Sequence, residues 1–120
     1  MNKWVLLEHK VFSDKSLDIH YDFLVENGID CLTWKFLKLP LLNQASIKIS
    51  KQPNHRIVWL SRKEHELSDN RGFVKRIDHG IFKSVSDKLD FEDYRFILDG
   101  ELLSGLFEIS GNSCRLSKNY

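Results

Sequence analysis

The sequence predicts an all-β protein, a small closed or nearly closed antiparallel β-barrel of about eight strands. Short runs rich in β-branched and aromatic residues recur along the chain, and turn dipeptides separate several of them. Helical periodicity is nearly absent outside residues 39–44 (LPLLNQ). Because closure removes exposed strand edges, a barrel is the expected architecture for so small a β-protein.

The first half of the chain contains three expected strands. Residues 4–9 (WVLLEH) form the first, and residues 20–26 (HYDFLVE) form the second. Asn27 and Gly28 then precede residues 31–38 (CLTWKFLK). Asn-Gly between two such runs is the strongest short-range signal for a β-hairpin, so the second and third strands should pair antiparallel.

The second half continues the pattern. Further strands are expected at residues 55–61, 72–78 and 80–85. Within residues 94–110, Asp99 and Gly100 predict a second hairpin turn. Gly111 and Asn112 predict a third hairpin just before the last strand.

Composition limits the class of protein. The chain has 120 residues, of which 42% are hydrophobic and 29% are charged, which is typical of one globular domain over residues 1–120. No apolar run is long enough to span a membrane, so no membrane partner is expected. The net charge of +1 argues against broad, charge-driven coating of nucleic acid but is compatible with a local phosphate site.

The termini and cysteines suggest an ordinary intracellular protein. The start of the chain, MNKWVLLEHKVF, lacks the features of a secretory signal, so we expect a cytoplasmic protein. Cys31 and Cys114 are too few for a disulfide framework and should be reduced, with at least one in the core. No exposed heptad or long apolar edge is apparent, which favours a monomer.

The second expected strand places two metal-ligating residue types together. Side chains alternate along a strand, so His20 and Asp22 share one face, while Tyr21 and Phe23 share the other, which is the natural core face. An imidazole nitrogen and a carboxylate oxygen so close together can bind one divalent ion or hydrogen-bond each other.

A metal site needs a third ligand. His9, at the end of the first expected strand, is the leading candidate. Two histidines and one carboxylate suit Mn²⁺, Zn²⁺ or Fe²⁺. The alternative is a surface His/Asp pair beside an unrelated histidine. Glu26, on the same face, either orients a ligand histidine or ends the strand.

A set of motifs covers almost the whole chain. In order they are WVLLEH, HYDFLVE, LTWKFLKLP, NHRIVWL, NRGFVKRIDHGIF and ILDGELLSGLFEI. From about residue 4 to residue 117, this order resembles the 3′-phosphoesterase module at the front of bacterial DNA ligase D, and more closely its short stand-alone relatives.

The resemblance implies a compact β-barrel that removes phosphate and ribonucleotide from DNA 3′ ends during break repair. The metal, Mn²⁺ or Zn²⁺, would be held by His9, His20 and Asp22, and His55 would contact the scissile phosphate. His55 can supply a hydrogen bond there, or act as a general acid if it is protonated. The implied substrate is a nucleic-acid 3′ end or a small phosphoester, and repair proteins are possible partners.

The chain departs from that family at several places. Trp59 stands where the family often carries a tyrosine, and residues 63–65 (KEH) replace its usual tyrosine-glutamate-glycine. Leu24 stands where the family carries a phosphate-contacting arginine, and Arg71 is the preferred substitute. Its alternative role is a loop arginine that caps a carbonyl or pairs with Asp69. It lies in a charged connection over residues 61–72 that either is solvated or faces the substrate. The interval between the two histidines is also longer than usual, so residues 10–19 are expected to be an extended loop.

Three functional hypotheses follow. The first is a metal-dependent phosphoesterase-like enzyme. The second is a non-catalytic barrel of the same fold that binds nucleic acid or a protein partner, with Leu24 marking the loss of catalysis. The third is a phosphate or nucleotide sensor, which would bind its ligand without hydrolysis.

Overall fold

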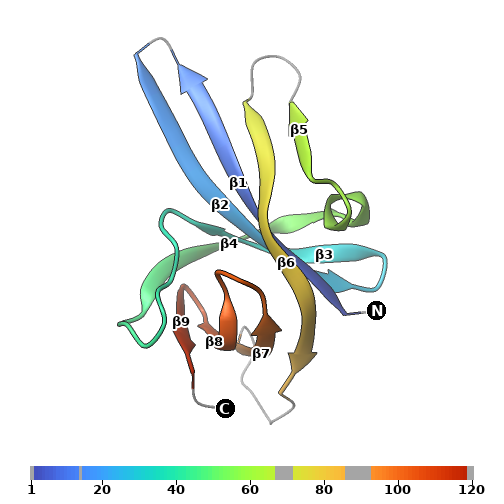
Figure 1. The fold of residues 1–120 in the computed structure, drawn as a ribbon, viewed down its shortest axis with the longest axis vertical. Coiled ribbons are helices and arrows are strands. Elements are labelled where there is room, and N and C mark those ends of the chain that lie inside the picture. Colours follow the sequence, from blue (N-terminus) through green and yellow to red (C-terminus); the bar gives the residue numbers. More distant parts are fainter. Residues whose placement is uncertain (1, 14, 67–71, 86–92, 119–120) are drawn as a thin grey trace.

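The computed structural model describes residues 2–13, 15–66, 72–85 and 93–118. The strands in this part of the chain are β1 (Lys3–Ser13), β2 (Ser16–Asn27), β3 (Asp30–Phe36), β4 (Ile47–Arg56), β5 (Glu64–Glu66), β6 (Phe73–Ser84), β7 (Asp93–Asp99), β8 (Ser104–Ser110) and β9 (Ser113–Ser117) (Figure 1). One 3₁₀ turn, η1 (Ile57–Leu60), follows β4 directly.

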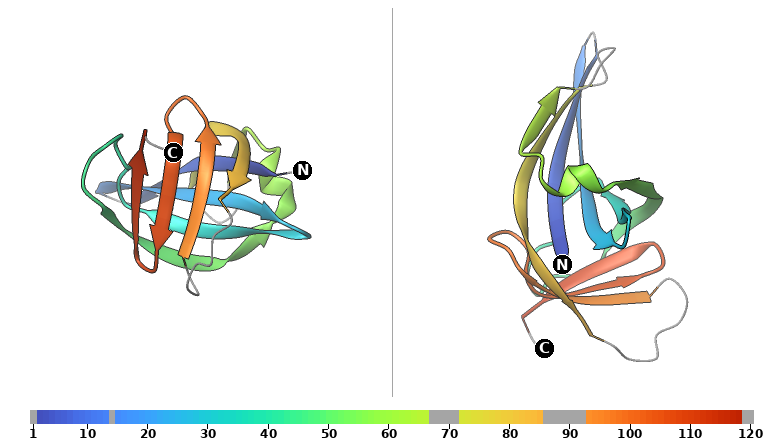
Figure 2. Two further views of the ribbon diagram at one scale, coloured as in Figure 1. Left: turned by 90° about the horizontal axis from the view of Figure 1, so that it is seen from below. Right: turned by 90° about the vertical axis from the view of Figure 1, so that its right-hand side faces the viewer.

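Hydrogen bonds close the strands into a ring. The sheet order is β1-β2-β3-β4-β9-β8-β7-β6-β5, and β1 also pairs with β6. The ring therefore runs through eight strands, all paired antiparallel, and β5 is an addition at the start of β6. The strands enclose a common interior when viewed from below (Figure 2). The prediction of a nearly closed antiparallel barrel of about eight strands is confirmed.

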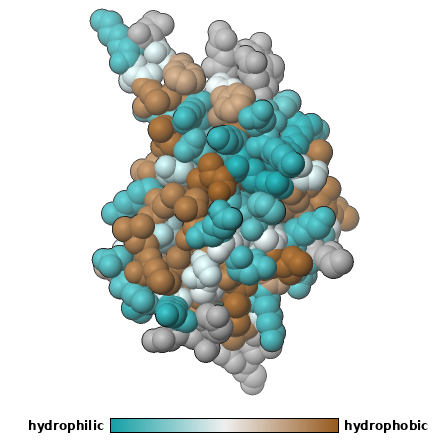
Figure 3. Space-filling model, viewed as in Figure 1, coloured by the Kyte–Doolittle hydropathy of each residue, from teal (hydrophilic) through white to brown (hydrophobic). Residues whose placement is uncertain are grey.

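The β1–β2 hairpin extends beyond the barrel (Figure 1). The ladder continues to the pair Ser13 and Ser16, whose hydroxyl oxygens lie 2.7 Å apart. Residues 10–19 are therefore mainly strand, and the expectation of an extended loop there was wrong. The β-prone pair Phe12 and Leu17 lies opposite across this ladder and remains exposed. Hydrophobic side chains are visible on this protruding part in Figure 3.

The barrel interior is filled by aromatic rings. Phe23 lies among them, with its ring centroid 4.9 Å from that of Phe107 and 5.9 Å from that of Trp4. All three side chains are fully buried, as is Trp34. Phe23 points inward because it alternates with His20 and Asp22, which confirms the predicted core face of the second strand.

A second, smaller apolar cluster lies on the outer face of β1 and β2. Its buried members are Val5, Leu7, Leu24, Cys31, Leu60 and Val74, and Trp59 packs against them. Leu60 and Trp59 belong to η1, which covers this face and keeps water from it. The sheet is therefore buried on both faces in this part, which lies next to His9 and Asp22.

Other parts of the secondary structure also differ from expectation, among them β5, which lies within the connection expected over residues 61–72. The run expected as a strand at residues 55–61 contains only the end of β4 and then the turn η1, while most of β4 was not predicted. The helical tendency at residues 39–44 is not realised: Leu42 makes one isolated bridge with Leu116, and Asn43 has a positive φ of 58°. The conformation of these residues is therefore set by tertiary contacts rather than by a local helical periodicity.

The two runs at residues 72–78 and 80–85 form one strand, β6, without a break at Gly80. A side chain at Gly80 would collide with the carboxylate of Asp99 and crowd the indole of Trp4. The glycine therefore allows close packing inside a strand rather than a turn.

The predicted hairpins are present. Gly28 and Gly111 occupy left-handed turns, with φ of 71° and 57°, between β2 and β3 and between β8 and β9. The β7–β8 connection is longer than a two-residue turn. It is held by Asp78, whose carboxylate accepts the backbone N–H groups of residues 79, 101, 102 and 103 at 2.8–3.0 Å.

Both cysteines are free and buried, in agreement with the prediction of reduced thiols in the core. Burial raises the pKa of the Cys31 thiol to about 11 and that of Cys114 to about 12. In the part of the chain that the structure describes, no helix is long and apolar enough to cross a membrane.

Candidate metal centre

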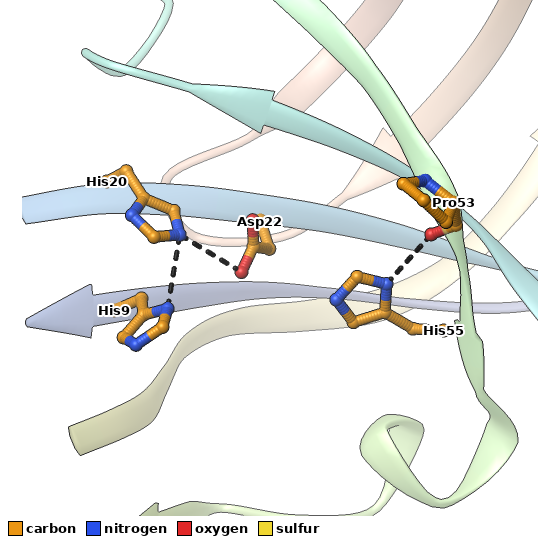
Figure 4. Close-up of polar contacts among 5 residues, drawn as sticks. All are labelled: His9, His20, Asp22, Pro53 and His55. Atoms are coloured by element: carbon orange, nitrogen blue, oxygen red, sulfur yellow. Dashed lines mark hydrogen bonds and ion pairs between the residues drawn. The ribbon is translucent and has the colours of Figure 1, made fainter. Parts of the chain in front are cut away.

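His9 and His20 face each other across the β1–β2 ladder. They are direct partners in the register, and His9 Nδ1 lies 3.1 Å from His20 Nε2 (Figure 4). The ring centroids are 4.5 Å apart. This pairing exists because β1 continues past His9 and β2 begins well before His20, so the ten-residue interval folds back as a hairpin.

Asp22 completes a three-residue cluster. It follows His20 by two positions on β2, so its side chain leaves the same face, and its Oδ2 lies 3.5 Å from His20 Nε2. One ligand atom from each of His9, His20 and Asp22 lies within 4.8 Å of the others. The structure thus brings together the three residues that the sequence indicated, and the group can hold a metal ion.

The contacts among these side chains are compatible with two states of the site. Without an ion, a proton on His20 Nε2 can be shared between the lone pair of His9 Nδ1 and the Asp22 carboxylate. With an ion, one atom of each side chain can act as an electron-pair donor toward the cation.

The spacing of the ligand atoms also suits a metal. Ligand nitrogens about 2.0–2.1 Å from a tetrahedral zinc ion lie roughly 3.3 Å from one another. The 3.1 Å distance from His9 to His20 and the 3.5 Å distance from His20 to Asp22 lie on either side of that value.

A small cavity opens beside this cluster. Its volume is about 170 Å³, and it is lined by Leu7, His9, Asp22, His55, Trp59 and Val74. His55 comes from the end of β4, opposite Cys31 of β3, and its Nδ1 lies 3.0 Å from the Pro53 carbonyl oxygen. Three of the predicted site residues therefore line one cavity, and His20 contacts two of them, His9 and Asp22.

No protein-family model matches the chain, and no characterised protein matches it significantly.

Leu24 is fully buried in the outer apolar cluster. It lies two positions beyond Asp22 on the same face, under η1, so this position offers a methyl-rich wall rather than a phosphate-binding cation. Arg71, the preferred substitute, lies outside the described residues. Among the described residues that line the cavity there is no lysine or arginine.

Glu26 is placed away from the ligands. Its Oε1 accepts the backbone N–H of Lys3 at 3.0 Å, near the end of β2 farthest from the protruding tip. This hydrogen bond lowers the pKa of the Glu26 carboxyl group. Of its two predicted roles, the structure favours the one at the strand end.

Trp59 lines the cavity, a position that its predicted role in core or rim packing did not specify. Core or rim packing is the commoner role of a tryptophan, and the run around it was expected to be a strand. The turn η1 instead carries Trp59 over the outer face of β1. The Arg62 guanidinium lies 5.1 Å from the centroid of its ring, and the His65 ring lies 5.6 Å away, edge to face. These contacts hold the indole as a wall of the cavity.

A larger cavity of about 690 Å³ lies along β6 and the β7–β8 connection. Its acidic residues Asp78 and Asp99 already accept hydrogen bonds from the backbone and from the Trp4 indole. Lys63, Arg76 and other charged side chains of both signs surround them. Size does not identify the functional site here, since the residues that can bind a metal surround the smaller cavity.

Proposed function

We propose that this protein is a metal-dependent phosphoesterase-like enzyme that hydrolyses a phosphoester at a nucleic-acid 3′ end during DNA repair. The observation that carries the proposal is the convergence of His9, His20 and Asp22 beside a cavity that His55 also lines. The resemblance to the DNA ligase D module supports the choice of substrate. Ligase and polymerase activities would belong to partner repair proteins.

His9, His20 and Asp22 would hold the ion, for which Mn²⁺ and Zn²⁺ are the proposed identities. When bound, the ion would neutralise phosphoryl oxygens and make a water molecule more acidic. The rest of the site is formed by the protein itself. The outer apolar cluster limits access of bulk water, which strengthens electrostatic interactions inside the cavity.

The charge of the site limits how the substrate can bind. Asp22 offsets one of the two positive charges of a bound ion, and Leu24 contributes none. A dianionic terminal phosphate therefore requires a further cation, and Arg71 remains the proposed source. A bidentate guanidinium contact would fix the phosphate as well as neutralise it.

The deciding experiment measures phosphate release from a 3′-phosphorylated primer-template with Mn²⁺. Asp22→Ala should abolish turnover and weaken Mn²⁺ binding measured by calorimetry. Asp18→Ala is the matched control, because it removes an exposed carboxylate from the same strand and should preserve both. Folding of each variant is verified by circular dichroism.

A non-catalytic barrel is the second candidate, and the burial of Leu24 favours it, because it removes a phosphate contact expected for catalysis. It predicts a folded, metal-loaded wild type without turnover. Saturable binding of a 3′-phosphorylated oligonucleotide would then indicate a sensor or binding module. Turnover that requires Asp22 excludes this alternative.

A further inference from the structure

The register of β3 and β4 contains a bulge immediately before His55. Thr33 pairs with Gln52, but Cys31 pairs with His55. Two steps along β3 therefore correspond to three steps along β4, so one extra residue lies at Pro53 or Asn54. Proline has no backbone N–H to donate to a ladder, which makes a bulge a suitable place for Pro53.

The bulge determines which side chain of β4 faces the cluster of His9, His20 and Asp22. Thr33 pairs with Leu24 and so lies on the outer face, and its partner Gln52 shares that face. If the side chains of β4 alternated without a bulge, Asn54 would be the next side chain on this outer face. With the extra residue His55 takes that place, while Asn54 hydrogen-bonds Asp30 at 3.1 Å.

The Pro53 carbonyl then selects the form of the imidazole. A carbonyl oxygen only accepts hydrogen bonds, so the 3.0 Å contact requires His55 Nδ1 to carry a proton. A neutral ring with a proton on Nδ1 has its lone pair on Nε2. In Figure 4 this second nitrogen lies on the side of the ring that faces His9 and Asp22.

We propose that the bulge and the Pro53 carbonyl make His55 a proton acceptor for the attacking water, rather than a donor to the phosphate. This inference rests on the proposed function. As the water oxygen bonds to phosphorus, its proton passes to Nε2 and the P–O bond to the leaving oxygen breaks. The leaving oxygen gains a proton from solvent, and His55 later returns its own proton to solvent.

The tautomer can be tested without turnover. In metal-free protein labelled with ¹⁵N-histidine, the His55 ring should show a protonated Nδ1 and an unprotonated Nε2 at a pH where it is neutral. His55→Asn provides the assignment by removing one set of signals. A neutral His55 with its proton on Nε2 would overturn the inference, whatever the activity of the protein.

Kinetics test the role of the lone pair. His55→Asn can retain a donor toward the Pro53 carbonyl but lacks Nε2. It should lower kcat by about 10²- to 10⁴-fold, with KM and Mn²⁺ affinity nearly unchanged. His79→Asn, at an exposed position on β6, is the control and should keep wild-type kinetics.

The outcomes separate this inference from the proposed function. Wild-type turnover that Asp22→Ala abolishes but His55→Asn preserves would overturn the role of His55 alone. A rise in KM with unchanged kcat in His55→Asn would identify a phosphate contact and also overturn it. Absence of wild-type turnover would remove the catalytic role together with the proposed function, while the spectrum still decides the tautomer.

Discussion

His9 and His20 are separated by eleven positions in the chain, yet they are direct partners in the β1–β2 ladder, with ring nitrogens 3.1 Å apart. The hairpin beyond them sets this distance. A shift of one residue in the register would move His9 to the opposite face from His20 and dissolve the cluster. The protruding part of the hairpin therefore has a structural role in forming the candidate metal centre.

Metal binding should stabilise the fold. An ion bound only by the native state adds about 2.7 kcal/mol to the free energy of unfolding at a concentration 100 times its Kd. Thermal unfolding of the wild type with Mn²⁺ or Zn²⁺ should therefore shift upward, and His20→Ala should lose the shift. His79→Ala is the control. An equal shift in both variants would place the ion elsewhere.

An arginine placed at position 24 should not create a phosphate-binding site. Leu24 is fully buried among Val5, Leu7 and Leu60, so Leu24→Arg places an uncompensated guanidinium in an apolar cluster. We expect a loss of at least about 3 kcal/mol in the free energy of unfolding, measured with urea. Leu24→Met, which nearly conserves volume, should cost less than about 1.5 kcal/mol. A stable, more active Leu24→Arg protein would contradict this interpretation.

Arg71→Ala tests the proposed phosphate contact of Arg71. If Arg71 contacts the phosphate, its loss should raise KM for a 3′-phosphorylated substrate by roughly 10- to 100-fold, the equivalent of one charged hydrogen-bond contact. Asp69→Ala distinguishes the alternative, because a structural pair between the two would make both variants equally unstable. Unchanged kinetics in Arg71→Ala would return the search to other basic residues.

The cysteines predict how stability depends on pH. Burial raises the thiol pKa of Cys31 to about 11 and of Cys114 to about 12 in the folded protein, from ordinary values near 9. Above pH 9 the unfolded chain loses these protons while the folded protein keeps them, so the unfolded state binds fewer protons and stability falls as pH rises. Urea unfolding between pH 8 and pH 11 measures the decrease.

A Cys31→Ala/Cys114→Ser double variant should show a smaller decrease over the same range. Thiol-specific labelling of the native protein at pH 8 should also be slow, since both side chains are buried and protonated. Rapid labelling without unfolding would contradict the assigned burial.

Asp78 should be one of the most sensitive positions outside the site. Its carboxylate accepts four backbone N–H groups, three of which, from residues 101–103, belong to the β7–β8 connection. Asp78→Asn keeps the shape but replaces one accepting oxygen with a donor, so we expect a loss of about 2–4 kcal/mol in the free energy of unfolding. Glu101→Gln, an exposed change in the same connection, should alter it by less than about 0.5 kcal/mol. Equal effects would argue against this role.

Local patterns in the sequence determined part of the site. Alternation along β2 is a property of any extended chain, so the shared face of His20 and Asp22 and the inward direction of Phe23 could be predicted from spacing alone. The turns at Gly28 and Gly111 could be predicted for a similar reason, since few residues other than glycine adopt positive φ readily.

The remaining features depend on contacts between distant residues, and only the tertiary structure decided them. Strand pairing places His9 opposite His20, and packing of η1 on the outer face makes Trp59 a cavity wall. The bulge at Pro53 reverses the face that alternation assigns to His55. Register, packing and bulges are set by the free energy of the whole fold rather than by neighbouring residues. The sequence by itself could therefore name the candidate ligands but not bring them together.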